Sequence, residues 1–571
     1  MLKEWIVTLH NKEDLDDFYE EMENPGGSFF IPDRSVEIAV RRPISRNTHY
    51  MLTEAEAKKL RDDPRVWDVA DKEWIVNNVT IRPAGWTITN GQFDRAWDNP
   101  GDPDDINWGL LRHTNKQNLL SGNWGLGGTN IVNSDLTITA SGKNVDVVIF
   151  DGHVDPGHPE FAINPDGTGG SRVIQYNWFQ NDIGFGTGNY AYTPYVVTTP
   201  SATYPDNNLN GIPDITEDND HGCHVAGTVA GNTQGWARDA NIYNINIYGT
   251  NPNFGTLGFS TTTYWDYVRA WHNSKPINPA TGRRNPTISN HSYGSALTFT
   301  NCTRIIYRGV DFNKGSDLTW DELAARGVYV PQTGNSAASN FVVPYYFTAI
   351  QADIYDAMDD GILVIAAAGN DSFKIVDEND QDYNNFIFYN GGGAGIYTNR
   401  GTGSAAGLSR VITVGSLDNN NTEYKSAFSQ TGSRVDIFAA GENIISSLQT
   451  MPGVYGSIDP RDNNYYLGEY QGTSMASPQV CGVGALLLEH FPNMTQEELH
   501  SWFANTPVVN EMSDTGTNNV LDVQSLQGAP NKLLYWENIR PETGTTFPMK
   551  KFKARPTSGR TYPRPKIRRK G

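Results

Sequence analysis

Three short motifs in this chain hold a serine, a histidine and an aspartate that could together form a nucleophilic site. Ser474 lies between a glycine turn and the apolar run from Val480 to Leu488, which predicts a buried helix. The N-terminus of such a helix carries unpaired N–H groups and a partial positive charge, and both stabilise an oxyanion formed there. A serine hydroxyl is nevertheless a weak nucleophile unless a base and an orienting carboxylate lie beside it.

The partners that this serine needs occur earlier in the chain. His221 is the candidate base, and it opens the small-residue segment 221–228. Asp151 is the candidate carboxylate, and it ends the apolar, β-branched run from Val145 to Phe150, which predicts a buried parallel strand. Open α/β sheets place their sites at the carboxyl ends of strands, so Asp151 stands where a site is expected.

A fourth motif could supply the donor for the oxyanion. Residues 362–370 predict another buried strand, which ends in the side-chain amide of Asn370. An amide N–H aimed at a developing oxyanion stabilises the transition state of acyl transfer. The order along the chain is therefore Asp151, His221, Asn370 and Ser474.

These motifs, in this order, resemble those of the subtilisin-like serine proteases (subtilases). The resemblance runs from about Trp108 to about Ala504 and includes further family segments, at residues 158–160, 411–416 and 429–441. It implies a serine endopeptidase that hydrolyses polypeptide substrates. In that reaction Ser474 would attack the scissile carbonyl, His221 would transfer the proton, Asp151 would orient His221, and Asn370 would stabilise the oxyanion. The same resemblance implies that Ser292, Tyr293 and Gly294 bind the substrate backbone as an added strand.

Cys223 departs from the family pattern, which usually has threonine beside the base. Its closeness in sequence to His221 predicts sensitivity to mercurials. The alternative is an inert, buried small residue.

Predicted strands and helices alternate along the region of resemblance. The strands are expected at residues 144–151, 241–248, 287–293, 362–370, 411–416 and 435–440. The alternation predicts an α/β fold, a subtilisin-like doubly wound and mostly parallel sheet with helices on both faces. Large insertions, at about 163–219, 297–345, 371–400 and 450–470, are expected to be loops.

The sequence predicts four parts. Residues 1–82 form a small α+β domain that resembles the ferredoxin-like prodomain of subtilases, which would act as an intramolecular inhibitor; a permanent docking domain is the alternative. Residues 83–107 are interpreted as a linker with the processing site of a zymogen. Residues 108–527 are the expected catalytic domain, and residues 528–571 a Pro-rich basic tail.

Residues 206–217 have the spacing of a twelve-residue calcium loop, so structural Ca²⁺ is the expected cofactor and no catalytic cofactor is expected. The oxygen ligands would come from Asp206, Asn208, Asn210, Ile212, Asp214 and Glu217. Pro213 and the lack of a clear flanking helix depart from the EF-hand. The alternative is a solvated turn rich in asparagine and aspartate.

Composition sets limits on the partners. The formal net charge of -20 argues against nucleic acid or acidic membranes as partners of the body. The tail is the exception, because residues 550–570 hold ten basic and no acidic residues. It could bind an acidic partner, nucleic acid or the acidic body, or be a solvated end.

No stretch approaches the roughly 18 apolar residues of a membrane span. The N-terminus lacks the pattern of a secretory signal. We therefore expect an intracellular protein, or one carried in a macromolecular assembly. A second hypothesis for the function is a structural or interaction component of such an assembly, for example a virus particle, on a subtilase scaffold.

Overall fold

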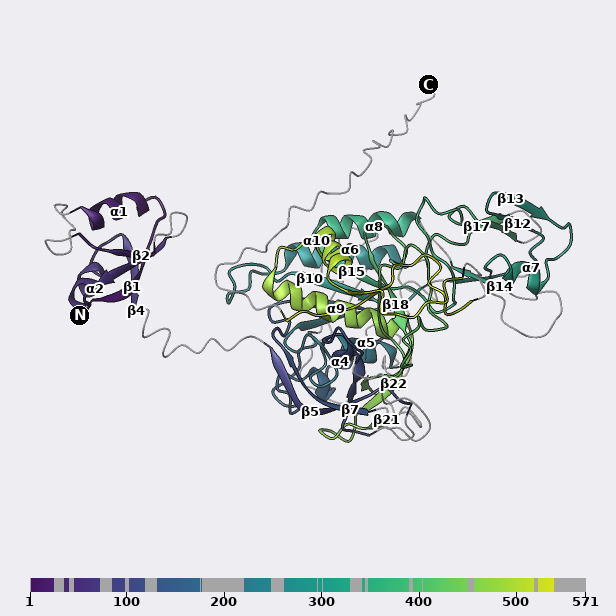
Figure 1. Cartoon of the computed structure of the whole chain (residues 1–571), viewed down its shortest axis with the longest axis horizontal. Helices are drawn as coiled ribbons and strands as arrows, with labels where there is room; N and C mark the ends of the chain where they lie inside the picture. Colours follow the sequence, from purple (N-terminus) through teal and green to yellow (C-terminus); the bar gives the residue numbers. More distant parts are fainter. Residues whose placement is uncertain are drawn as a thin grey trace, which may run out of the picture. The chain divides into compact units, whose positions relative to one another are not determined.

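The computed structural model divides the chain into two compact units, Met1–Pro83 and Ala84–Gly571 (Figure 1). The residues that it describes are 2–24, 35–40, 46–71, 85–97, 102–118, 131–174, 176, 220–247, 261–294, 296–299, 301–328, 341–344, 348–389, 394–402, 404–449, 456–517 and 522–538. None of the described helices is long and apolar enough to cross a membrane.

The smaller unit is an antiparallel sheet with two helices in the order βαββαβ. Its strands lie in the order β2-β3-β1-β4, which is the order of ferredoxin-like domains. The elements are β1 (Lys3–Leu9), α1 (Leu15–Glu23), β2 (Ile38–Val40), β3 (Asn47–Leu52), α2 (Glu54–Leu60) and β4 (Val66–Asp71). Thr53 and Glu56 form the capping box that starts α2, as the sequence predicts. Alternate residues of β1 and β3 are buried, so one face of this sheet covers a core of its own.

The larger unit is built on an eight-stranded sheet in the order β23-β24-β19-β18-β15-β10-β8-β9. Every neighbouring pair is parallel except β23 with β24. The strands are β8 (Asp146–Asp151), β9 (Asn241–Asn246), β10 (Thr287–His291), β15 (Ile362–Ala367), β18 (Ile412–Leu417), β19 (Ile437–Ala440), β23 (Val508–Val509) and β24 (Lys532–Leu533). The predicted mostly parallel α/β sheet is therefore confirmed.

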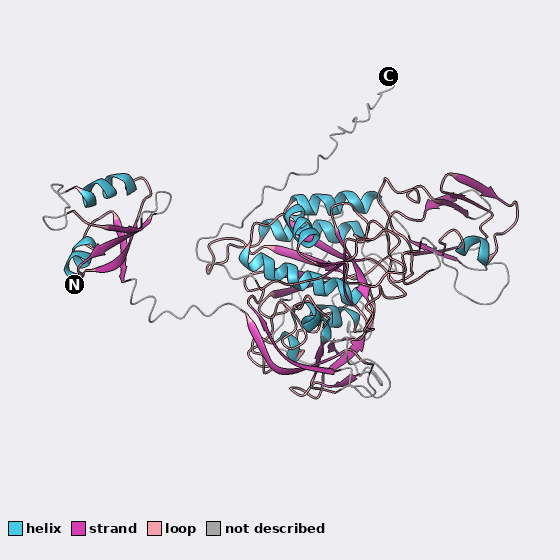
Figure 2. Ribbon diagram, viewed as in Figure 1, coloured by secondary structure: helices cyan, strands magenta, loops and turns pink. Residues whose placement is uncertain are grey.

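Helices cover both faces of this sheet because its central strands are apolar on both sides (Figure 2). Val147 and Ile149 of β8 belong to one core, which includes α5 (His221–Ala230), α9 (Thr473–His490) and α10 (Gln496–Asn505). Val148 and Phe150 belong to the opposite core, with α6 (Thr261–Ser274) and α8 (Thr348–Asp359). Side chains of a strand alternate between faces, so each strand contributes to both cores.

The interpretation of residues 83–107 as a linker is wrong for most of that segment. Residues 86–94 form β5 (Trp86–Asp94), and residues 105–107 form β6 (Asp105–Asn107). Both pair in a three-stranded sheet with β7 (Ile131–Ile138) that belongs to the larger unit. The polar composition suggested a solvated linker, but Asp94, Arg95 and Asp105 are buried in the folded unit.

The predicted start of the tail at residue 528 is also wrong. Lys532–Leu533 is strand β24 of the main sheet, and Trp536 is buried. The main chain of Trp536 donates a hydrogen bond to the carbonyl of His113, which follows α4 (Trp108–Arg112). The apolar residues 533–536 therefore belong to the folded body, and residues 539–571, which include the basic segment, lie outside the described residues.

Two of the predicted loop insertions fold together instead. The strands β12 (Arg304–Tyr307) and β13 (Val310–Asn313) come from one insertion, and β16 (Phe386–Tyr389) and β17 (Ala394–Tyr397) come from the other. They form one antiparallel sheet with its own small core, which also includes Leu323 of α7 (Trp320–Ala324). Residues 296–299 (β11) pair with Phe341–Pro344 (β14) in a separate ribbon.

Candidate active site

The candidate residues lie at the carboxyl ends of neighbouring strands. The register pairs His291 of β10 with Phe150 of β8 on one side and with Ala366 of β15 on the other. Asp151 and Ser292 therefore lie at the same level of the sheet, where β8 and β10 end. This is the edge at which open α/β sheets place their sites.

Asp151 and His221 form a close pair. Nδ1 of His221 lies 2.6 Å from Oδ1 of Asp151, whose side chain is fully buried. The same oxygen accepts a hydrogen bond from the main chain of Gly152, which fixes the carboxylate. A carboxylate on Nδ1 leaves the other ring nitrogen, Nε2, as the one that can accept a proton from a nucleophile.

His221 is held at the start of α5 by a second sheet. This sheet has the order β20-β22-β21 and consists of β20 (Ile444–Leu448), β21 (Gly456–Ile458) and β22 (Tyr466–Tyr470). The hydroxyls of Ser446 and Ser447 donate to the carbonyls of His224 and Cys223, each at 2.8 Å. The carboxylate of Asp220, the residue before the helix, accepts from the main chain of Gln449 at 2.9 Å. The position of the candidate base therefore depends on residues 444–449.

A proline inside α9 links the candidate nucleophile to β10. Pro478 has no N–H to donate to the carbonyl of Ser474, four residues earlier. That carbonyl instead accepts from the hydroxyl of Ser292 at 2.9 Å, and the hydroxyl of Ser474 donates to the carbonyl of Ser292 at 3.1 Å. Ser292 and Ser474 are thus linked by two hydrogen bonds, which connect the first turn of α9 to the end of β10.

Asn370 is oriented by the residue before the nucleophile. Its Oδ1 accepts from both the main chain and the hydroxyl of Thr473, each at 2.9 Å. The other atom of this amide, Nδ2, lies close to Gly472: a Cβ added to Gly472 would be 3.3 Å from it. Gly472 also has a φ of 150°, which favours glycine. The amide N–H groups therefore face the segment that carries Ser474, as an oxyanion donor requires.

Six of the candidate residues line one pocket with a volume of about 300 Å³, whereas Asp151 is not among its lining residues. His221, Asn370 and Ser474 lie on its wall together with Ser292, Tyr293 and Gly294. The sequence reasoning missed its other lining residues, which are Pro344, Ala367, Gly369, Asp371, Thr402, Gln430 and Thr473. Asp371 and Thr473 could have been found as neighbours of Asn370 and Ser474, whereas Pro344 comes from an insertion that no motif marks.

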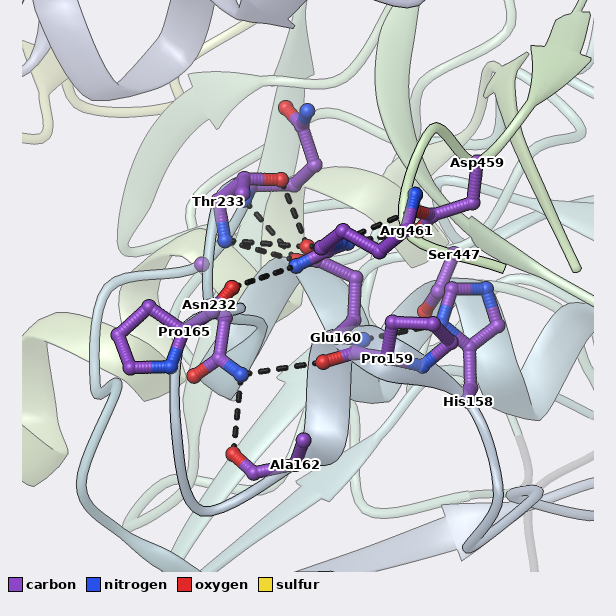
Figure 3. A network of polar contacts seen from close by, with 12 residues as sticks. His158, Pro159, Glu160, Ala162, Pro165, Asn232, Thr233, Ser447, Asp459 and Arg461 are labelled. Atoms are coloured by element: carbon purple, nitrogen blue, oxygen red, sulfur yellow. Dashed lines mark hydrogen bonds and ion pairs between the residues drawn. The ribbon is translucent and has the colours of Figure 1, made fainter. Parts of the chain in front are cut away.

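A buried ion cluster joins the segments that carry Asp151 and His221 (Figure 3). Glu160 lies in the short helix η1 (Pro159–Phe161), and it accepts hydrogen bonds from Thr233 and from the main chain of Gln234, after α5. Arg461, between β21 and β22, binds both Glu160 and Asp459 at 2.6 Å. Burial alone would raise the pKa of Glu160, but the Arg461 charge and these hydrogen bonds lower it to about 2.

Two further sequence predictions concern Cys223 and the calcium loop. Cys223 is fully buried, burial raises the pKa of its thiol, and its Sγ lies 3.9 Å from the hydroxyl of Ser447. These features favour the inert alternative, and the mercurial sensitivity stays a prediction. Residues 206–217, the predicted calcium loop, lie outside the described residues, and their metal site stays a prediction. Within the described ranges no cluster of three or more His, Cys, Asp or Glu side chains could hold a metal ion.

The larger unit has a doubly wound α/β body, and at the carboxyl edge of its sheet the Asp151–His221 pair lies beside a pocket that His221 and Ser474 line. Residues 142–529 match the model of the subtilase family, which spans more than half of the chain. The chain belongs to the subtilase family.

Individual relatives are distant. The chain is 22% identical over 484 residues to alkaline serine exoprotease A of Vibrio alginolyticus, covering 85% of this chain and 57% of that protein. It is 26% identical over 450 residues to subtilisin-like protease 3 of Arthroderma otae, covering 76% and 78%. It spans about half the length of the first relatives it matches. A solved structure of a cold adapted subtilisin-like serine proteinase aligns at 21% identity and a TM-score of 0.40, covering 75% of this chain and 97% of that one.

Proposed function

We propose that this chain is a serine endopeptidase that hydrolyses polypeptides through Asp151, His221 and Ser474. The observation that carries the proposal is the 2.6 Å contact between His221 and the buried carboxylate of Asp151, beside a pocket that both His221 and Ser474 line. Asp151 would keep the proton of His221 on Nδ1, so that Nε2 accepts the proton of the Ser474 hydroxyl as the serine attacks. His221 would then return that proton to the leaving amine.

The tetrahedral oxyanion would be stabilised by Nδ2 of Asn370 and the main-chain N–H of Ser474. Asn370 follows β15 and is held by Thr473, and Ser474 lies in the first turn of α9, so little reorganisation is needed as charge develops. Residues 292–294 directly follow β10 and line the pocket, and their main chain would pair with an extended peptide substrate. The activity is tested by incubating the full chain with an unfolded protein substrate. We expect cleavage that phenylmethylsulfonyl fluoride stops, and an inert chain would contradict the proposal.

Asn370→Ala should lower kcat by about 10²–10³-fold with little change in KM, because the oxyanion exists only in the transition state. Peptide hydrolysis under steady-state conditions measures both constants. Asn379→Ala, which changes an exposed asparagine on the loop after β15, serves as the matched control and should be silent. An unchanged kcat in Asn370→Ala would contradict the proposed role of Asn370 in stabilising the oxyanion.

We also propose that the smaller unit is an inhibitory prodomain removed by self-cleavage. Cleavage within β5 or β6 would break the folded body, because Trp86 donates to the carbonyl of Trp236 and lies 3.5 Å beneath Arg238. The N-terminus of the active chain should therefore lie before Trp86. Intact mass and N-terminal sequencing of the active protein test this. A new N-terminus between residues 87 and 107, or an active chain of full length, would contradict it.

A further inference from the structure

The inserted sheet of β12, β13, β16 and β17 carries large apolar side chains on both of its faces. Figure 1 shows β12, β13 and β17 together at one end of the larger unit. One face, with Ile305, Ile387 and Ile396, covers the small core of this sheet. Because side chains alternate along a strand, their neighbours lie on the other face. We call four of these the aromatic face, and none belongs to a core of the described residues: Ile306, Phe386, Phe388 and Tyr397.

Ring contacts order the aromatic face. Phe386 packs edge to face against Tyr397 of the neighbouring strand, with ring centroids 4.9 Å apart, and against Phe388 at 5.0 Å. The guanidinium group of Arg304 lies 4.4 Å from the centre of the Phe388 ring, and that of Arg400 lies 3.3 Å from the centre of the Tyr397 ring. Tyr397 is 38% exposed, and Phe386 and Phe388 are partly exposed. Accessible aromatic side chains beside arginines are typical of binding surfaces.

Short segments of chain connect the aromatic face to the catalytic pocket. Val343 of β14 belongs to the core on the other side of the sheet, and the next residue, Pro344, lines the pocket. Arg400, which stacks on Tyr397, stands two residues before Thr402, which also lines the pocket. Two residues span at most about 7 Å, so this edge of the aromatic face lies near the rim of the pocket.

We propose that the aromatic face is a second binding surface for the polypeptide substrate, which holds an apolar or aromatic segment with a carboxylate beside it. The inference rests on the proposed function and deepens it, since only a long substrate reaches both the pocket and this face. Contact at two linked sites strengthens binding because the second contact is intramolecular. The carboxylate is expected because Arg400 donates to the carbonyl of Tyr383 and to Oδ1 of Asn384, neither of which is charged.

Two other occupants fit this face less well. A second copy of the chain would bring together two proteins that each have a net charge of -20. The basic segment 550–570 would bring its ten basic residues against Arg304 and Arg400. A polypeptide segment with apolar side chains and one carboxylate carries little net charge, so neither repulsion arises.

The test compares a long and a short substrate on the active wild type and on Phe388→Ala/Tyr397→Ala. The long substrate is reduced, carboxymethylated α-lactalbumin, and the short one is a fluorogenic peptide that fills the pocket alone. We expect KM for the long substrate to rise at least about tenfold with kcat unchanged, because aromatic anchors contribute most of the binding energy of an interface. The kcat/KM for the short peptide should stay at the wild-type value, which a misfolded variant would not show.

Tyr355→Ala is the matched control. Tyr355 lies on α8, outside the pocket and the inserted sheet, and the guanidinium group of Arg410 lies 5.5 Å from the centre of its ring. This variant should retain the wild-type constants for both substrates. Arg400→Gln removes the charge and spares the rings, so it should raise KM for the long substrate about threefold. An unchanged KM in Arg400→Gln would overturn the preference for a carboxylate.

Three results would overturn the binding surface itself. One is a double variant that keeps the wild-type KM for the long substrate, and another is an equal loss of kcat/KM for the long and the short substrate. The third is a wild-type dimer in sedimentation that Phe388→Ala/Tyr397→Ala dissociates, since the face would then hold a second copy.

A binding measurement tests the face without catalysis. Fluorescein-labelled, carboxymethylated α-lactalbumin should bind to the full Ser474→Ala chain, and its Kd should rise at least about tenfold when Phe388→Ala/Tyr397→Ala is added. Equal binding by the two proteins would overturn the inference. If the wild type hydrolyses neither substrate, the proposed function fails, and this measurement still decides whether the aromatic face binds a polypeptide.

Discussion

Ser474→Ala should reduce kcat for peptide hydrolysis by roughly a millionfold, the loss established for subtilisin, a member of this family, when its triad serine is removed. The reason is chemical: without the hydroxyl there is no nucleophile for His221 to deprotonate, and only transition-state binding remains. The fold should be retained, because the carbonyl of Ser474, which accepts from Ser292, is unaffected by the substitution. Steady-state hydrolysis and circular dichroism measure the two effects.

Ser409→Ala is the matched control, since Ser409 is an exposed serine that contacts Tyr355 away from the pocket. It should retain the wild-type rate. His221→Ala should be about as inactive as Ser474→Ala, and the double variant should be little worse than either, because the two residues act as one unit. A Ser474→Ala chain with more than about a thousandth of the wild-type kcat would contradict the proposed nucleophile.

Arg461→Ala should destabilise the larger unit by about 3–5 kcal/mol, because it leaves Glu160 and Asp459 as buried carboxylates without their cation. The loss should appear as a lower midpoint in urea unfolding. Arg304→Ala is the control, since Arg304 makes a similarly close contact with Asp311 on the surface. Exposed pairs contribute little, so that variant should unfold at the wild-type midpoint.

The loss of stability caused by Arg461→Ala should become smaller at low pH. The pKa of Glu160 is lowered to about 2 in the folded chain, below its ordinary value of about 4.5. A carboxyl group whose pKa is lowered on folding stabilises the folded state at every pH above its pKa in the unfolded chain. This stabilisation is lost as the pH falls from about 4.5 to about 2. The difference in the free energy of unfolding between the wild type and Arg461→Ala should therefore become smaller as the pH is lowered. A difference that grows toward low pH would contradict the ion cluster.

Much of the fold follows from local patterns in the sequence. Five of the six strands expected in the main sheet are buried runs, and the β-branched composition of residues 145–150 distinguishes that run from helix. The Thr53 capping box marks a helix start that the structure contains. Such signals are local, so they can be recognised without knowledge of what packs against them.

The parts that the sequence did not reveal depend on distant partners. Residues 86–94 are polar, but they pair with β7, about 45 residues later, and no local pattern shows that pairing. The sheet of β12, β13, β16 and β17 joins two insertions in the same way. At the site, sequence motifs predict four residues, Asp151, His221, Asn370 and Ser474. The contribution of Pro344 to the pocket could not be predicted, because it depends on how an insertion folds.

The central claim is that Ser474 is an activated nucleophile, and a fluorophosphonate probe tests it most directly. The full chain, before and after mild proteolysis that removes the smaller unit, would be treated with the probe and the modified peptide mapped by mass spectrometry. We expect the adduct on Ser474, and no adduct in His221→Ala, because the hydroxyl then lacks its base. A proteolysed chain in which Ser474 stays unmodified, or a His221→Ala chain modified as readily as the wild type, would contradict the assignment.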